Sequence, residues 1–149
     1  MRAVFQRVKE ASIEVSGAEI ARIGRGALVL LGVEAGDSEK DTAYVADKCC
    51  NLRVFDDREG RLNLSVMDMG GSILLVSQFT ILGDCRKGRR PSFVKAASQE
   101  EGKRLYELTA GLINARGVGV QTGRFQADMD VHLINEGPVT ILIDSRRFF

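Results

Sequence analysis

The 149-residue sequence has little of several residues that carry chemistry or cross-links: one histidine, three cysteines, two prolines and no tryptophan. An odd number of cysteines, with Cys49 and Cys50 adjacent, is no disulfide framework and predicts a reducing, cytoplasmic compartment. There is no C-x-x-C pair, and His132 is the only histidine, which argues against a structural zinc site. The longest clearly apolar run, 27–33, is far below the roughly 20 residues that span a bilayer, so no membrane segment is expected.

The net charge is close to zero, but the charges are unevenly distributed. The 21 Lys and Arg residues against 20 Asp and Glu residues give a formal +1, which argues against a protein that coats long stretches of nucleic acid. The segment 84–95 holds five cations and one acid, Asp84, a local charge of +4 that leaves −3 for the rest of the chain. The sequence therefore predicts one concentrated basic segment on an otherwise slightly acidic protein.

Several catalytic motifs are absent. A Ser-His-Asp triad needs a histidine as general base, and His132 shares a strand face with Asp130 and Ile134, which is typical of an exposed or hydrogen-bonded strand residue. No Walker loop, H-E-x-x-H or G-x-S-x-G sequence occurs, and the glycines lie in turns rather than in a dinucleotide-binding pattern. Kinase-like, reductive and metalloprotease activities find no support, and we expect no cofactor and no metal.

The apolar periodicity predicts a single α/β domain over residues 1–149, with mixed β-sheets that form a sandwich or barrel-like core and two main helices packed on one side. About eight strands are expected. The helix starts are marked by two capping pairs, Ser38 with Asp41 and Ser98 with Glu101. The second helix is predicted to face the core with Leu105, Leu108 and Leu112.

Strand alternation predicts where several polar side chains point. In the first strand, Arg7 shares a face with Phe5. Residues 72–80 form the strongest predicted strand, and a period of two points Gln78 and Thr80 in the same direction. These two polar groups either line a pocket or are satisfied by neighbouring backbone at a strand end.

The segment 135–138 (Asn-Glu-Gly-Pro) separates two strand-like stretches, 129–134 and 139–143. Gly-Pro between two strands predicts a tight hairpin turn. A trans proline is the default from local sequence, because only about 5–6% of X-Pro bonds in folded proteins are cis. Neither this segment nor 72–80 identifies a function alone.

Five ordered motifs identify a family when they are taken together. They are QRV at 6–8, SQFT at 77–80, GRRPSF at 88–93, QTGRF at 121–125 and NEGPVT at 135–140. In all five the sequence resembles the D-aminoacyl-tRNA deacylase family, and the resemblance runs from the first strand to the last. One departure is Ile81, where the family usually has the leucine that completes SQFTL; this change is conservative.

The resemblance implies a homodimer with two active sites at the interface, in which each subunit inserts a cis Gly137–Pro138 pair into the partner's site. It implies hydrolysis of the ester that joins a D-amino acid to the 3′ end of tRNA, with rejection of L-aminoacyl-tRNA. Glycyl-tRNA has no side chain to reject, so we expect it to be cleaved as well. The implied catalytic wall is Ser77, Gln78, Phe79 and Thr80. The implied substrate-binding residues are Asn135, Gly137 and Pro138, with Phe125 and Met129 near the adenosine end.

The basic loop is a candidate contact for the acceptor-stem phosphates of such a tRNA, with a solvated surface loop as the alternative. Its residues in this role are Arg86, Lys87, Arg89 and Arg90.

The missing histidine is compatible with this reaction because an aminoacyl ester is already activated. Orienting a water molecule and stabilising an oxyanion suffices, and our hypothesis gives the second task to backbone N–H groups near Phe79 and Thr80. The vicinal ribose hydroxyl of the substrate then helps to orient or activate the water. The rival hypothesis makes the Thr80 hydroxyl the nucleophile. Two other classes remain open: a non-catalytic RNA-binding module, and a hydrolase of another small ester.

Overall fold

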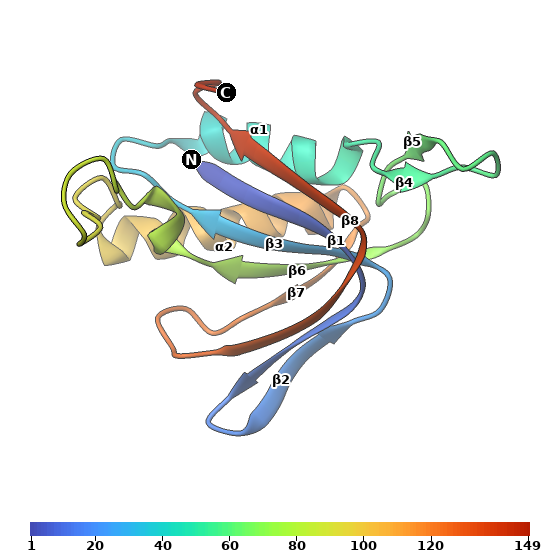
Figure 1. Cartoon of the computed structure of the whole chain (residues 1–149), viewed down its shortest axis with the longest axis horizontal. Coiled ribbons are helices and arrows are strands. Elements are labelled where there is room, and N and C mark those ends of the chain that lie inside the picture. Colours follow the sequence, from blue (N-terminus) through green and yellow to red (C-terminus); the bar gives the residue numbers. More distant parts are fainter.

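The fold is organised around one long, bent strand. The computed structural model describes residues 1–149, and its strand β1 (Arg2–Val15) pairs antiparallel with three others. Along one edge of β1, its first half pairs with β3 (Gly26–Gly32) and its second half pairs with β2 (Ala18–Ile23). Strand β8 (Asp130–Asp144) runs along the opposite edge. Because these long strands bend together, the sheet curls into a barrel-like shape (Figure 1).

The sheet is mixed, as predicted. Strand β6 (Ser72–Ser77) lies parallel to β3, and β7 (Gly119–Thr122) lies parallel to β6. Two short strands, β4 (Phe55–Asp56) and β5 (Leu62–Leu64), form a second, small sheet. The eight strands and the α/β class agree with the expectation from the sequence.

Both α-helices pack on the same face of the large sheet, which confirms the predicted layering (Figure 1). Helix α1 (Glu39–Asn51) and helix α2 (Gln99–Ala115) provide the crossovers that parallel neighbouring strands require. Both predicted helix starts are confirmed. The Asp41 carboxylate accepts hydrogen bonds from the Ser38 N–H and hydroxyl, and the Ser98 hydroxyl accepts one from the Glu101 N–H. Neither helix is long and apolar enough to cross a membrane.

The predicted core face of α2 is partly wrong. Leu108 and Leu112 pack only at the edge of the core. The centre of the buried stripe includes Tyr106 and Thr109. Their hydroxyls donate to the carbonyls of Leu75 and Leu105, respectively, so both polar groups are hydrogen-bonded although they are buried. The buried side-chain positions of this stripe are Leu105, Tyr106, Thr109 and Ile113.

Strand β6 is apolar on both faces because it separates two cores. Its residues Ile73 and Leu75 belong to the cluster of 21 buried residues under the helices. Leu74 and Val76 belong to a second cluster of nine buried residues inside the curl of β1, β2 and β3. A strand covered on both sides has a continuous hydrophobic run rather than an alternating one.

The chain does not make the hairpin turn predicted at 135–138. Residues 130–144 form the single strand β8, which stays paired with β1 on both sides of the interruption. Between the pairs Val8–Asn135 and Gln6–Thr140, β8 contains more residues than β1, so the excess forms a bulge. We call residues 136–139 the Gly-Pro bulge. A glycine and a proline fit there because a bulge relieves the requirement for regular ladder bonds.

The predicted strand 72–80 also ends early. Strand β6 stops at Ser77, and Phe79–Leu82 forms a short 3₁₀ helix, η1. The alternation argument for Gln78 and Thr80 therefore does not apply, since it requires an extended chain throughout. The two side chains nevertheless meet, because one turn of helix brings them together.

The contact between β3 and β6 leaves no room for a side chain at Gly26. A Cβ atom there would lie 1.9 Å from the carbonyl oxygen of Ser72, whereas a Cβ at Gly24 would meet nothing within 4 Å. We expect Gly26→Ala to lower the free energy of unfolding by about 1–3 kcal/mol or more. Gly24→Ala should change it by no more than about 0.5 kcal/mol. Urea unfolding of both variants tests this, and equal midpoints would contradict it.

Candidate functional site

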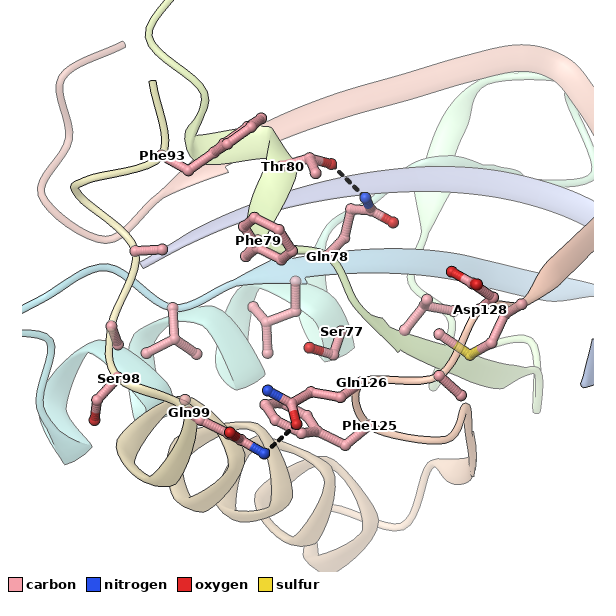
Figure 2. Close-up of a pocket in the computed structure, with 18 of the residues that line it drawn as sticks. Ser77, Gln78, Phe79, Thr80, Phe93, Ser98, Gln99, Phe125, Gln126 and Asp128 are labelled. Carbon is pink, nitrogen blue, oxygen red and sulfur yellow. Dashed lines mark hydrogen bonds between the residues drawn. The ribbon is translucent and has the colours of Figure 1, made fainter. Parts of the chain in front are cut away.

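A cavity of about 890 Å³ opens at the carboxyl ends of the parallel strands β3 and β6 (Figure 2). This is the end of an α/β sheet at which ligands commonly bind. One wall is formed by residues 76–80, and the opposite wall by the start of α2 and the loop 125–129. The lining offers hydroxyls, carboxamides and aromatic rings, and Asp128 is its only ionisable side chain.

The four predicted catalytic residues, Ser77, Gln78, Phe79 and Thr80, all line this cavity. The backbone N–H of Gln78 donates to the carbonyl of Leu31 over 2.8 Å, which fixes the turn from β6 into η1. Phe79 and Thr80 then open η1, and the first N–H groups of a helix have no partner within the helix. The end of β6 therefore places main-chain donors at the rim of the cavity.

The Thr80 hydroxyl has no general base beside it. Its Oγ1 atom accepts a hydrogen bond from the carboxamide Nε2 of Gln78 (Figure 2). A carboxamide cannot take up a proton near neutral pH, and Asp128 makes no hydrogen bond to Thr80. The arrangement lacks the pairing of nucleophile and base that activates a hydroxyl.

Aromatic contacts hold the two sides of the cavity in place. Phe79 packs edge-to-face on Phe93, with ring centroids 5.3 Å apart. On the opposite wall Phe125 lies 5.9 Å from Tyr106, whose hydroxyl donates to the carbonyl of Leu75 over 2.7 Å. Burial raises the pKa of Tyr106 well above its usual range, so this hydroxyl stays protonated and keeps its donor role. Aromatic packing and one uncharged hydroxyl therefore support both walls of the cavity.

Sequence reasoning missed part of the cavity lining. Gln99, at the start of α2, donates from Nε2 to the carboxamide oxygen of Gln126, so the two side chains meet at the cavity (Figure 2). Gln126 has a φ of 61°, unusual for a residue other than glycine, and Asp128 follows it in the same loop. For Gln126 and Asp128, a signal was available in the sequence: they lie between Phe125 and Met129, both of which line the cavity as expected.

The remaining predicted substrate residues, Asn135, Gly137 and Pro138, do not line the cavity of this chain. They lie in or next to the Gly-Pro bulge and are solvent-exposed. The Gly137–Pro138 peptide bond is cis, as the family resemblance implies and in contrast to the trans default from local sequence. The structure of one chain therefore separates these three residues from the four on η1 and β6.

A buried arginine holds the Gly-Pro bulge. Arg7 is only 5% exposed, and its Nε donates to the Glu136 carbonyl over 2.9 Å. Its Nη1 donates to the Val54 carbonyl over 2.8 Å and contacts the Asp56 carboxylate at 3.2 Å. A buried charge is costly unless its donors are all satisfied, so these partners are mutually fixed. Gly137 is close enough that a Cβ would lie 3.1 Å from Arg7.

The predicted tRNA-contacting loop is attached directly to the cavity wall. Asp84 and Ser92 exchange two backbone hydrogen bonds, of 2.8 and 3.0 Å, at the base of the loop that follows η1. Arg86 is held by a bidentate contact to Asp84, and its hydrogen bonds keep the pKa of that carboxyl well below its usual range. The loop residues Arg86, Lys87, Arg89 and Arg90 are all exposed.

His132 is an exposed strand residue, as expected. Its side chain is 58% exposed and lies 3.6 Å from the Glu14 carboxylate, on β8 and outside the cavity. It contributes no base to the site described above.

The fold and the cavity define an α/β protein whose site offers hydroxyls, carboxamides and main-chain donors in place of a histidine or cysteine. The family model for D-Tyr-tRNA(Tyr) deacylase matches residues 4–144. The D-aminoacyl-tRNA deacylase of Geobacter sulfurreducens is 57% identical over 146 residues, which cover 98% of this chain and 96% of that protein. The namesake from a Thermoanaerobacter species is 54% identical over the full length of both.

Two solved structures extend the comparison. A protein described as c-Myc DNA unwinding element binding protein is 40% identical, with a TM-score of 0.91 over 97% of this chain and 98% of its own. A probable eukaryotic D-amino acid tRNA deacylase has a TM-score of 0.79 at 19% identity over 95% of this chain, which shows the shared fold. The chain belongs to the D-Tyr-tRNA(Tyr) deacylase family, and membership makes it a hydrolase. The resemblance seen in the five motifs is thereby confirmed.

The contacts of Arg7 predict that lysine cannot replace it. Lysine keeps the charge but lacks the planar fork that reaches the carbonyls of Glu136 and Val54 together. We expect Arg7→Lys to speed backbone hydrogen exchange in residues 135–140 by about tenfold or more, with α1 and α2 unchanged. Arg22→Lys, at an exposed ion pair with Glu19, is the control. Equal exchange in both variants would show that Arg7 does not hold the bulge.

Proposed function

We propose that this protein hydrolyses the ester bond of D-aminoacyl-tRNA and releases a free D-amino acid and tRNA. The observation that carries the proposal is the cavity itself, which brings SQFT (77–80) together with Phe125 and Met129, as the resemblance implies. Relatives that cover at least 97% of this chain at 52–57% identity are named D-aminoacyl-tRNA deacylases. With three free thiols, the protein fits the cytoplasm, where aminoacyl-tRNA is used.

The reaction needs positioning more than it needs a strong base. A water oxygen attacks the ester carbonyl carbon, and the bond between that carbon and the ribose oxygen breaks. One proton of the water passes to the ribose oxygen, and the other is released to solvent as the amino acid leaves as a carboxylate. Backbone N–H groups of Phe79 and Thr80 hold the negative charge that develops on the carbonyl oxygen. The neighbouring ribose hydroxyl orients the water. This assignment is supported by the cavity lining, in which the Thr80 hydroxyl has an amide partner and no base.

Selection for the D configuration comes from main-chain atoms of a second subunit. The Gly-Pro bulge lies outside its own cavity and is exposed, as expected of a segment that enters the partner's site. Main-chain atoms of Gly137 and Pro138 next to the substrate Cα leave no space for an L side chain, whereas a D side chain points elsewhere. Glycine has no side chain to exclude, so glycyl-tRNA passes the same filter. The functional unit is a homodimer.

One observation favours a second candidate, a nucleic-acid-binding module without catalysis. The solved structure that is 40% identical is named for binding a DNA element. Hydrolysis of D-tyrosyl-tRNA by the purified protein separates the two functions: no release of D-tyrosine above the uncatalysed rate, with tRNA binding intact, would favour the module. Equal activity on a small D-tyrosyl ester without tRNA would instead indicate a general esterase.

The role of Thr80 is tested by Thr80→Ala, which removes the hydroxyl but keeps the backbone N–H. We expect the single-turnover rate on D-tyrosyl-tRNA to fall by no more than about tenfold, since the main-chain donor remains. A loss of about 10⁴-fold, with a trappable acyl-enzyme in the wild type, would make Thr80 the nucleophile instead.

The basic loop is tested by reversing the charges of Arg89 and Arg90. If they contact acceptor-stem phosphates, the double change to Glu raises KM and reduces the salt-dependence slope by about 0.9 for each cation lost on duplex nucleic acid. Arg61→Glu, on the exposed turn between β4 and β5, is the matched control. An unchanged KM and slope would show that the loop is only a solvated surface.

A further inference from the structure

A second hollow, of about 520 Å³, lies beside the catalytic cavity and has a different chemical character. Cations from three separate segments line it: Arg2 of β1, Arg86 of the basic loop, and Lys95. Asp84 is the only acid in the lining, so the lining residues have a net charge of +2. The loop and the N-terminal end of β1 lie at the same end of the sheet (Figure 1).

Two of these cations are already engaged, and one is free. Both oxygens of Asp84 are taken by Arg86, and the Nε of Arg2 donates to Asp144 over 3.0 Å. The ammonium group of Lys95 makes no hydrogen bond and no ion pair, although the Lys95 charge helps to lower the pKa of Asp84 after the larger effect of Arg86. The hollow therefore has spare hydrogen-bond donors, which are suited to an anion.

The hollow and the catalytic cavity share two walls. Phe79 and Thr80 of η1 line the cavity, while Leu82 and Gly83, at the other end of the same helix, line the hollow. Along the neighbouring segment, Val94 and Ala96 line the cavity and Lys95 lines the hollow. A substrate held against Thr80 is thus separated from the hollow by one helical turn and one segment of chain.

We propose that this hollow binds a phosphodiester of the single-stranded acceptor end of tRNA, next to the terminal adenosine, with Lys95 as its principal donor. This inference rests on the proposed function, because binding of the ester in the cavity determines where the 3′ end of the tRNA lies. A phosphodiester is the anion that every tRNA presents near the 3′ ester, whatever its sequence. Contacts to phosphates position a nucleic acid without reading its bases, which suits an enzyme that acts on many tRNAs.

The wall between the hollow and the cavity is closely packed. Gly83 packs so closely that a Cβ there would lie 2.9 Å from the ring of Phe93 and 3.0 Å from the Thr80 carbonyl. Phe93 in turn packs on Phe79. An anion bound in the hollow therefore registers the substrate against the same helical turn that carries the proposed oxyanion donors.

Lys95→Gln tests this site, because Lys95 is exposed and removing its charge leaves no buried partner behind. Arg2 is less suitable, since its partner Asp144 is only 1% exposed. Two substrates are compared: D-tyrosyl-tRNA, and 3′-O-D-tyrosyl-adenosine, which has the same ester and no phosphate. Lys103→Gln, on the outer part of α2 beside Glu107, is the control because it lines neither cavity.

We expect Lys95→Gln to reduce kcat/KM about tenfold on D-tyrosyl-tRNA and to leave it unchanged on D-tyrosyl-adenosine. The salt-dependence slope for the tRNA should fall by about 0.7, the value for one contact to a single strand. Lys95→Arg should restore both. An equal loss on the two substrates, or no loss on either, would overturn the phosphate site. A wild-type enzyme that hydrolyses neither substrate would overturn the proposed function, and this site with it.

Discussion

The buried guanidinium of Arg7 is the interaction on which the geometry of the proposed site most depends. It joins β1, the Gly-Pro bulge and the segment before β4 through carbonyls of Glu136 and Val54. Arg25 adds a second contact to the carboxylate of Glu136 at 3.1 Å. Because an unsatisfied buried charge costs far more than its hydrogen bonds contribute, the bulge is fixed in shape before any ligand arrives. The proposed exclusion of L side chains by the main chain of Gly137 and Pro138 requires this support, because it depends on the backbone keeping one fixed position.

The cavity at the end of β6 likewise relies on main-chain groups more than on charged side chains. It holds one ionisable side chain, Asp128, and its rim is a short helix that presents backbone donors. Such a site is unsuited to amides or other stable bonds, and it is adequate for an ester that is already activated. Because the cavity lining has no positive charge, the attraction for a polyanion comes from the surroundings, namely the loop after η1 and the hollow at Lys95. The overall charge of +1 is therefore compatible with a tRNA substrate that must be bound briefly and released.

Much of the architecture was predictable because it depends on local patterns. The capping pair at Ser38 predicts a helix start, and the apolar run at 73–76 predicts a strand, and both are present in the structure. The predictions that failed depend on long-range pairing: a Gly-Pro sequence is a turn locally, but β1 continues to pair on both sides and turns it into a bulge. Alternation placed Arg7 on the same strand face as Phe5, but it could not identify the partners of Arg7. These are the carbonyls of Val54 and Glu136, which are far from Arg7 in the sequence.

Selection for the D configuration by the Gly-Pro bulge is tested most directly by comparing D-tyrosyl and L-tyrosyl esters on one tRNA, with wild-type protein and Pro138→Ala. If main-chain atoms of the bulge exclude L side chains, the wild type hydrolyses the D ester at least about 100-fold faster than the L ester. Pro138→Ala then reduces this ratio at least about tenfold by admitting the L side chain. A wild type that cleaves both esters at similar rates would contradict it. So would a Pro138→Ala variant that keeps the full ratio, because the filter would then lie elsewhere.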